Sequence, residues 1–252
     1  MVRPLARRDL TVPMGTFVES AICALSDPEA YSRIESIANK KDIEAIGGEV
    51  ISGDLTIENL GLTSQNYQQL ISSITHILHA AASTQFDLPL SLARRHNVLT
   101  TQNLLTFAKQ CKSLLDFGFI STAYIAGKRS GEINENDFEH MAGFLNTYEK
   151  SKYEAEALVR TDIGKLPITI FRPSLVLTPY IKGQNTPIHA VTFCLLLAAK
   201  GLVPLLPGSE ESRLDIISGE SSAKAIVQIL LNNKKSFASS SWRATRWRPP
   251  AS

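Results

Sequence analysis

Phe117-Gly118-Phe119-Ile120-Ser121 is the stretch that decides the fold. It is a short, mostly apolar run that ends in a polar residue, as is typical of strands buried on both faces in a parallel sheet. Similar runs lie on both sides of it, at residues 21–25, 49–52, 76–79 and 168–171. Longer segments with helical spacing separate them. This alternation requires crossover connections and predicts an α/β fold with a doubly wound parallel sheet.

Three of the intervening segments have the pattern of helices. Thr63 or Ser64 can cap a first helix that continues to Ile74. The third covers about residues 147–160 and is rich in Glu, Lys and Ala. Apolar residues recur at helical spacing in the second, at Val98, Leu104, Leu105 and Ala108. After Pro173 the alternation loosens, and we expect one more helix at about 188–200.

Composition excludes several classes of protein. The 252 residues fit one domain with a small appendage, and a net charge of +2 gives no strong attraction to nucleic acid or membranes. The longest apolar run, 190–199, is shorter than the roughly 20 residues that a membrane span needs. Cys23, Cys111 and Cys194 have no paired ligand spacing, so we expect no metal site and a reducing compartment, the cytoplasm.

The sharpest chemical signal is Tyr148-Glu149-Lys150-Ser151-Lys152. Tyr148 and Lys152 are four residues apart and would share one face of a helix. A phenol with a pKa near 10 is a poor acid or base at neutral pH, but a nearby ammonium would lower that pKa. Taken alone, a solvated helix face is the commoner explanation of this spacing.

Ser121 and Thr122 place two hydroxyls at the carboxyl end of the predicted strand 117–121. Ligands bind at that edge in open α/β sheets, and a hydroxyl there can hold a substrate carbonyl beside Tyr148. A helix cap or turn is the alternative use of such residues.

Six segments follow one another in a defined order between Gly53 and Val176. They are Gly53-Asp54-Leu55 with Asn59-Leu60-Gly61-Leu62, His79-Ala80-Ala81-Ala82, Asn97-Val98, Ser121-Thr122-Ala123-Tyr124, Tyr148 to Lys152, and Phe171-Arg172-Pro173-Ser174. Their order and approximate spacing resemble the extended short-chain dehydrogenases/reductases. They are most similar to the thioester-reductase and fatty-acyl-CoA-reductase (male-sterility) branch. The resemblance covers about half of the chain and implies a Rossmann-like fold.

The resemblance implies three catalytic residues. Tyr148 would donate a proton to the carbonyl oxygen, and Lys152 would bind the nicotinamide ribose and tune the tyrosine. Thr122 would be the catalytic hydroxyl, with Ser121 as the neighbouring alternative. Asn97 would either join this hydrogen-bond network or hold two backbone segments together. His79 is expected to pack or hydrogen-bond locally rather than bind a metal.

The resemblance also implies a nicotinamide cofactor, NADP, with NAD as the alternative. Besides Lys152, the residues that would contact it are Asp54 and Leu55 at the adenine, Ala80 and Ala81 where the backbone approaches closely, and Pro173 and Ser174 at the nicotinamide. The substrate would be an acyl thioester on a carrier protein or coenzyme A, reduced to an aldehyde or alcohol.

The chain departs from the family pattern at three places. The first twenty residues hold one glycine, Gly15, and no Gly-rich turn for the pyrophosphate. The run 21–25 corresponds best to the family's second strand, so we expect that the first strand and its turn are missing and that cofactor binding is weak. Leu25-Ser26-Asp27 lacks the arginine for a 2′-phosphate, which leaves Arg33. Residues 215–220 lack the family's Pro and Val-Asp-Tyr.

The predicted organisation is an atypical N-terminal segment (1–20), an incomplete NAD(P)-binding domain (21–176), a small substrate-side lobe (177–235) and a tail (236–252). The tail interleaves Trp and Arg, and we interpret it as disordered rather than as a nucleic-acid patch. Two other functions stay open: a nucleotide-sugar epimerase or dehydratase with the same Tyr and Lys, and a non-catalytic remnant or binding module. The residues at 59–62 and 121–124 favour the reductase.

Overall fold

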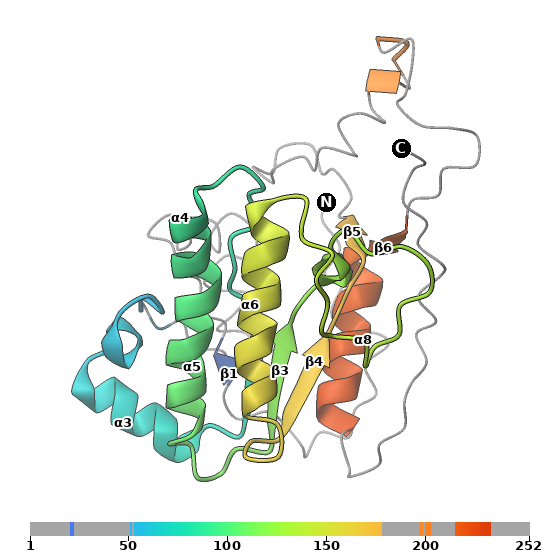
Figure 1. Ribbon diagram of the computed structural model, residues 1–252. Helices are drawn as coiled ribbons and strands as arrows, with labels where there is room; N and C mark the ends of the chain where they lie inside the picture. Colours follow the sequence, from blue (N-terminus) through green and yellow to red (C-terminus); the bar gives the residue numbers. More distant parts are fainter. Residues whose placement is uncertain are drawn as a thin grey trace.

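A parallel four-stranded sheet forms the centre of the molecule (Figure 1). The computed structural model describes residues 21–22, 51, 53–177, 197–198, 200–202 and 215–232. The strand order is β1-β2-β3-β4, with β1 at Ala21–Ile22, β2 at His76–His79, β3 at Asp116–Ile120 and β4 at Ile168–Phe171. All neighbouring strands are parallel, which confirms the predicted α/β sheet. Most of the predicted strand at 49–52, most of the helix at 188–200 and the whole tail at 236–252 lie outside the described residues.

Strand β1 occupies an informative place in this sheet. Ala21 pairs with His76 and Ile22 with Ile77, so β1 lies directly beside β2. With residues 21–25 counted as the second strand and 49–52 as the third, β2 is the fourth strand of the fold. In the usual doubly wound order, the first strand lies beside the fourth. We expected residues 21–25 to form the family's second strand and the first to be missing. In the described residues the place beside β2 is taken by Ala21–Ile22, and no strand earlier in the chain is described.

The helices follow the predicted alternation. Helix α3 (Ser64–Ser73) begins after Thr63, whose side chain accepts a hydrogen bond from Asn66 N at 3.2 Å, as the capping pattern predicted. The remaining described helical elements are η1 (Glu58–Gly61), α4 (Leu90–Arg94), the π-helical η2 (Arg95–Leu99), α5 (Thr100–Ala108), η3 (Ala123–Ala126), α6 (Thr147–Thr161) and α8 (Gly219–Asn232).

Strand β3 shows how the sequence creates three layers. Side chains alternate between the two faces of a strand, so Phe117 and Phe119 point one way and Gly118 the other. Both phenylalanines are buried in one core cluster with residues of α5 and α6. A Cβ added to Gly118 would lie 2.8 Å from Leu230 of α8. Helices therefore cover both faces of the sheet, as a doubly wound fold requires.

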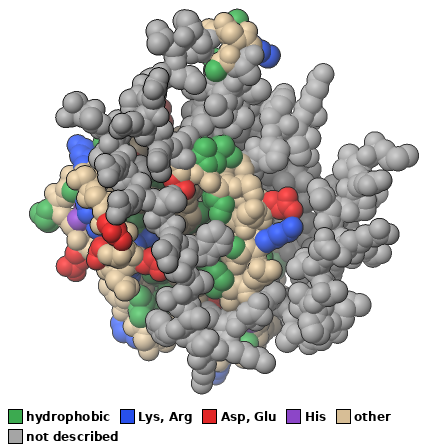
Figure 2. All heavy atoms as spheres, turned by 90° about the vertical axis from the view of Figure 1, so that its right-hand side faces the viewer, with side chains coloured by type: hydrophobic (Ala, Val, Ile, Leu, Met, Phe, Trp, Pro, Cys, Tyr) green, Lys and Arg blue, Asp and Glu red, His purple; other side chains and the backbone are tan. Residues whose placement is uncertain are grey.

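Two short strands lie outside the main sheet. Strands β5 (Leu175–Leu177) and β6 (Ile216–Ser218) pair in parallel, and α8 follows β6 directly. Residues 177–235 were predicted to form a lobe, yet α8 packs on β3 through Leu230; the boundaries of the lobe stay a prediction. Figure 2 views the molecule from this side, and the acidic and basic side chains of the described residues are interspersed there. Every helix in the described ranges falls short of the length and apolar character that a membrane crossing requires.

Candidate active site

The carboxyl ends of β2, β3 and β4 meet at one edge of the sheet. His79 is level with Phe119, and Ile120 is level with Phe171. The residues that follow these strands are therefore brought together. Ala123 N donates to Pro173 O at 3.0 Å, which places Pro173 beside the segment that carries Thr122. The edge predicted to bind ligands is thus assembled from segments that are distant in sequence.

Helix α6 brings Tyr148 and Lys152 to this edge. The helix begins after Asn146, whose side chain accepts a hydrogen bond from Glu149 N at 2.9 Å. The Glu149 carboxylate in turn accepts from Leu145 N at 2.9 Å, so side chains satisfy N–H groups at the helix start. Tyr148 lies in this fixed first turn, and Lys152 follows one turn later on the same face.

The Thr122 hydroxyl lies near the Tyr148 phenol and acts to lower its pKa. Thr122 is buried, and its hydroxyl also accepts from Tyr124 N at 3.2 Å. The structure therefore joins the predicted phenol and hydroxyl, which are 26 residues apart in the chain. It does not support the expected lowering of the tyrosine pKa. Burial raises the pKa of Tyr148, and the nearby Thr122 hydroxyl only partly opposes this effect.

Lys152 does not point its charge at the phenol. Its Nζ donates to Ile120 O at 2.6 Å and lies 4.4 Å from the centroid of the Phe119 ring. The residue is 3% exposed, and burial lowers the pKa of Lys152 to about 7, while the Glu156 carboxylate raises it. The ammonium is thus held at the end of β3 and is not directed at the phenol. The pKa of Tyr148 is therefore raised by burial and not lowered by the charge of Lys152.

Ser121 has a different partner from Thr122. Its hydroxyl donates to Glu156 Oε2 at 2.6 Å, inside the protein. A hydroxyl engaged with a buried carboxylate is less able to hold a substrate carbonyl. Among the two residues considered for this role, the geometry favours Thr122.

Asn97 holds two segments together. Its side chain accepts from Ser83 N at 2.8 Å and donates to Ser83 O at 3.1 Å and to Ser151 Oγ at 2.8 Å. The Ser151 hydroxyl donates to Tyr148 O at 2.9 Å. Of the two roles expected for Asn97, the structure therefore shows the one that ties the loop after β2 to α6. Asn97 lies within the π-helix η2, a rare conformation that is frequent at functional sites.

His79 is a packed, neutral residue, as expected. Its Nε2 lies 2.9 Å from Thr101 Oγ1, and the Thr101 hydroxyl donates to Asn97 O. Because that hydroxyl hydrogen is already committed, Nε2 must carry the proton toward Thr101. Burial lowers the pKa of His79 to about 3. In the part of the chain that the structure describes, no group of three or more His, Cys, Asp or Glu side chains is placed to hold a metal.

The predicted adenine-side residues lie in a tight turn. Asp54 N donates to Leu60 O at 2.8 Å, and Asp54 Oδ1 accepts from Thr56 N at 2.8 Å. Asn59, Leu60 and Gly61 all have positive φ, and a Cβ on Gly61 would lie 2.7 Å from Asp54 N. The backbone geometry of this turn thus explains why a glycine stands at position 61 of the segment 53–62. The side chain of Leu55 lies in the core, so its contact with an adenine stays a prediction.

The remaining cofactor residues lie at the edge of the sheet. Ala80 is exposed and Ala81 is buried directly after β2, and Ser174 donates to Asp215 O at 2.7 Å. The Lys152 ammonium carries three N–H groups, and Ile120 O takes one of them, which leaves donors for ribose hydroxyls. These residues fit the nicotinamide ribose of a dinucleotide. Arg33, the residue left for a 2′-phosphate, lies outside the described residues.

Two residues near the site were not singled out from the sequence. Glu156 lies one turn after Lys152 on the same helix face, a spacing that could have drawn attention to it. Phe86 lies in the loop after β2, and its ring centroid is 5.6 Å from that of Tyr148. Its ring is 54% exposed, so it presents an apolar surface beside the phenol. No local pattern distinguishes Phe86.

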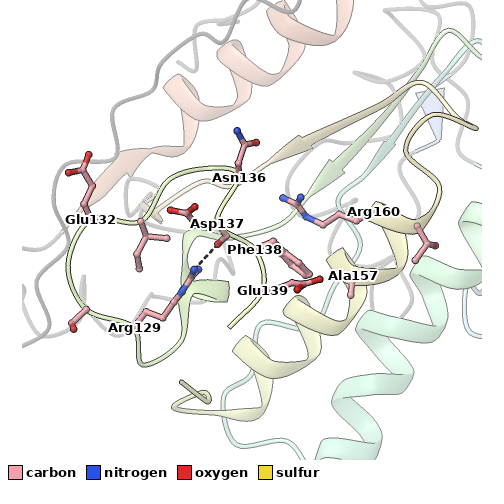
Figure 3. Close-up of a pocket in the computed structure, with 11 residues that line it drawn as sticks. Arg129, Glu132, Asn136, Asp137, Phe138, Glu139, Ala157 and Arg160 are labelled. Carbon is pink, nitrogen blue, oxygen red and sulfur yellow. Dashed lines mark hydrogen bonds between the residues drawn. The ribbon is translucent and has the colours of Figure 1, made fainter. Parts of the chain in front are cut away.

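An open hollow of about 960 Å³ lies elsewhere (Figure 3). It is formed by the loop before α6 and by the second half of α6, including Arg129, Phe138 and Arg160. None of the predicted catalytic or cofactor residues lines it. The residues predicted to carry the chemistry thus lie at the sheet edge and not in this hollow.

Comparison with known proteins identifies the family and the fold. The family model described as male sterility protein, an NAD-binding domain, matches residues 24–226. The fatty acyl-CoA reductase wat of Drosophila melanogaster is 26% identical over 71% of this chain and 40% of its own length. The carboxylic acid reductase of Mycobacterium marinum is 30% identical over 72% of this chain and 17% of its own length. The chain thus spans less than half of either relative.

A solved structure agrees with the fold. The terminal R domain from the myxalamid PKS-NRPS biosynthetic pathway superimposes with a TM-score of 0.63 at 25% identity. The match covers 83% of this chain and 55% of that one. The described sheet and helices are therefore those of a known reductase-domain fold.

Proposed function

The chain belongs to the male sterility protein family of NAD-binding domains, and from this premise we propose that it is a reductase that reduces acyl thioesters with a nicotinamide dinucleotide. The observation that carries the proposal is the placement of the Tyr148 phenol near the Thr122 hydroxyl at the carboxyl edge of the sheet, with the Lys152 ammonium at the adjoining strand end. The two relatives named above are reductases of fatty acyl-CoA and of carboxylic acids.

The residues present suit reduction. When bound, the cofactor supplies a hydride to the carbonyl carbon. Tyr148 gives its proton to the carbonyl oxygen, and Thr122 donates a hydrogen bond to that oxygen as charge develops on it. A raised pKa keeps Tyr148 protonated at neutral pH, which is the form that a proton donor needs. The resulting hemithioacetal splits into an aldehyde and a thiol, and a second reduction of the aldehyde gives the alcohol.

The finer features of the proposal concern cofactor, carrier and compartment. We propose NADPH as the reductant and Thr122, Tyr148 and Lys152 as the catalytic residues; Asp54, Leu55, Ala80, Ala81, Pro173 and Ser174 would contact the cofactor. The acyl group would arrive on coenzyme A or a carrier protein. The free thiol of Cys111 agrees with a reducing compartment, and we propose the cytoplasm.

Substitution of Tyr148 tests the function directly. Purified chain is incubated with a long-chain acyl-CoA and NADPH or NADH, and oxidation of the nicotinamide is followed by its absorbance. We expect Tyr148→Phe to lower kcat by about 10²–10⁴-fold, because the proton donor is lost. NADPH binding, measured by fluorescence, should stay at the wild-type level.

Tyr153→Phe is the matched control. Tyr153 lies on the same helix, but its ring stacks on Phe138 at 4.5 Å and not on the catalytic edge. It should retain wild-type activity. Equal activity of wild type and Tyr148→Phe would contradict the proposal, and NADPH binding without turnover of any acyl thioester would favour the binding-module alternative. Conversion of a UDP-sugar by the wild type in the presence of NAD would favour the epimerase.

A further inference from the structure

Glu156 is a buried carboxylate beside the catalytic edge. It has no exposed surface and lies on α6, one turn beyond Lys152. Four hydrogen bonds reach its two oxygens, one from Ser121 Oγ at 2.6 Å, one from Arg160 Nε at 2.8 Å and two from Arg172, of which the Nε bond is 3.1 Å. A buried charge is tolerated only with such partners. These donors lower the pKa of Glu156 although burial raises it, so the carboxylate is ionised.

The donors come from three parts of the chain. Ser121 follows β3, Arg172 follows β4, and Arg160 is on α6 itself. The same two arginines also donate to Glu135 O, Arg172 at 2.9 Å and Arg160 at 3.5 Å. Figure 3 shows Arg160 above the Phe138 ring of the loop before α6, 4.5 Å from its centroid. Glu156 therefore ties both strand ends and this loop to one point of α6.

Glu156 lies close to two of the proposed catalytic residues, Thr122 and Lys152. Ser121 directly precedes Thr122, so its bond to Glu156 fixes the backbone that presents the Thr122 hydroxyl. Lys152 is one helical turn from Glu156. Among the described residues, the titratable groups that face Lys152 are Glu156 from α6 and the neutral His79 from β2. The Ile120 carbonyl and the Phe119 ring face it from β3.

We propose that Glu156 is a positioning residue of the active site, whose buried carboxylate holds Thr122 in place through Ser121 and sets a negative charge one helical turn from the Lys152 side chain at the end of β3. The catalytic part of this inference rests on the proposed reductase function; the placement of Lys152 does not. A purely structural ion cluster would also bury Glu156, but it would leave the charge state of Lys152 unchanged.

The test compares Glu156→Gln with Glu154→Gln in the full chain. Glu154 is also on α6 and pairs with Arg94 in two bonds of 2.7 Å at the surface, so it is a matched carboxylate remote from Lys152. The titration of Lys152 is followed by NMR of ¹³C-labelled lysine, with Lys152→Arg to assign its signal. The pH profile of kcat/KM for NADPH is measured in parallel.

We expect the Lys152 titration in Glu156→Gln to move down by about one pH unit, because an attractive charge is removed while both arginines remain. The alkaline limb of kcat/KM should move with it, and kcat should fall at least tenfold because Thr122 is no longer held. Glu154→Gln should match the wild type in all three measurements. A Lys152 titration that is identical in Glu156→Gln and wild type overturns the proposal, even if the variant is less stable.

Two further variants cover the case in which Glu156→Gln does not fold. Ser121→Ala removes one donor and should lower kcat while it leaves the Lys152 titration unchanged; Glu156→Asp keeps the charge and should keep the titration near that of the wild type. A shifted Lys152 titration in Glu156→Asp, or full kcat in Ser121→Ala, contradicts the positioning role. If the wild type reduces no thioester but Glu156→Gln still shifts the Lys152 titration, the proposed function fails and the placement of Lys152 by Glu156 stands.

Discussion

At the scale of single residues, burial controls the chemistry more than sequence neighbours do. Lys152 is nearly inaccessible and meets one carbonyl and one aromatic face, so its charged form is poorly solvated. Tyr148 lies near the Thr122 hydroxyl and yet keeps a raised pKa. Both shifts arise because water is excluded from the strand end.

The pKa of Lys152 predicts how stability depends on pH. The native pKa is about 7, below the ordinary 10.5, so between these values the unfolded chain binds a proton that the native chain lacks. The free energy of unfolding should therefore rise with pH across this window, by at most about 1.4 kcal/mol per pH unit. Urea unfolding from pH 6 to about pH 10 measures it.

Lys152→Met should remove this contribution, and its stability should depend less on pH than that of the wild type. Lys150→Met, a change on the partly exposed side of the same helix, serves as the control. Parallel pH curves for wild type and Lys152→Met would contradict the assigned pKa.

At the scale of elements, the start of α6 determines where the phenol lies. Asn146 caps the helix, Glu149 accepts from Leu145 N, and Asn146 Nδ2 donates to Glu149 Oε1 at 3.0 Å. Thr147 Oγ1 donates to Leu88 O at 2.8 Å, which fixes the loop after β2 to the same turn. The first turn of α6 is thus held by local bonds and by the long-range bonds of Thr147 to Leu88 O and Phe86 O.

Removal of the cap should loosen this turn. We expect Asn146→Ala to lower the free energy of unfolding by about 1 kcal/mol, because Glu149 N loses its acceptor. Asn146→Ser, which keeps an acceptor, should cost less than half of that. Chemical denaturation followed by circular dichroism measures both variants, and equal losses in the two would argue against capping as the cause.

At the scale of the whole molecule, Gly118 allows the third layer to form. A Cβ at this position would lie 2.8 Å from Leu230 of α8 and 3.1 Å from Leu78 of β2. The absence of a side chain on β3 therefore lets α8 approach the sheet on the face opposite α5 and α6. Helix α8 packs on the sheet through this contact.

Larger residues at Gly118 should weaken the docking of α8. Gly118→Val should destabilise the chain by about 1–3 kcal/mol through overpacking, and Gly118→Ala by less. In a double-mutant cycle, Leu230→Ala should restore part of the loss, because it removes the atoms that clash. Strict additivity of the two changes would show that Leu230 is not the group that the new side chain meets.

The sequence by itself determined the order and type of the three central strands and of the three main helices between residues 63 and 171. Apolar periodicity predicted β2, β3 and β4, and the capping pattern at Thr63 predicted the start of α3. It also predicted that Tyr148 and Lys152 share a helix face. These features depend on residues a few positions apart, so they can be read from a local pattern.

The tertiary structure decided which groups meet across the chain. It placed Thr122 and not Ser121 against Tyr148, directed Lys152 to Ile120 O, and assigned Ser121 to the buried Glu156. It also reversed the expected direction of the Tyr148 pKa and put Ala21–Ile22 beside β2. Solvent exclusion and contacts between distant segments exist only after the strands and helices have packed, and no local pattern of residues encodes them.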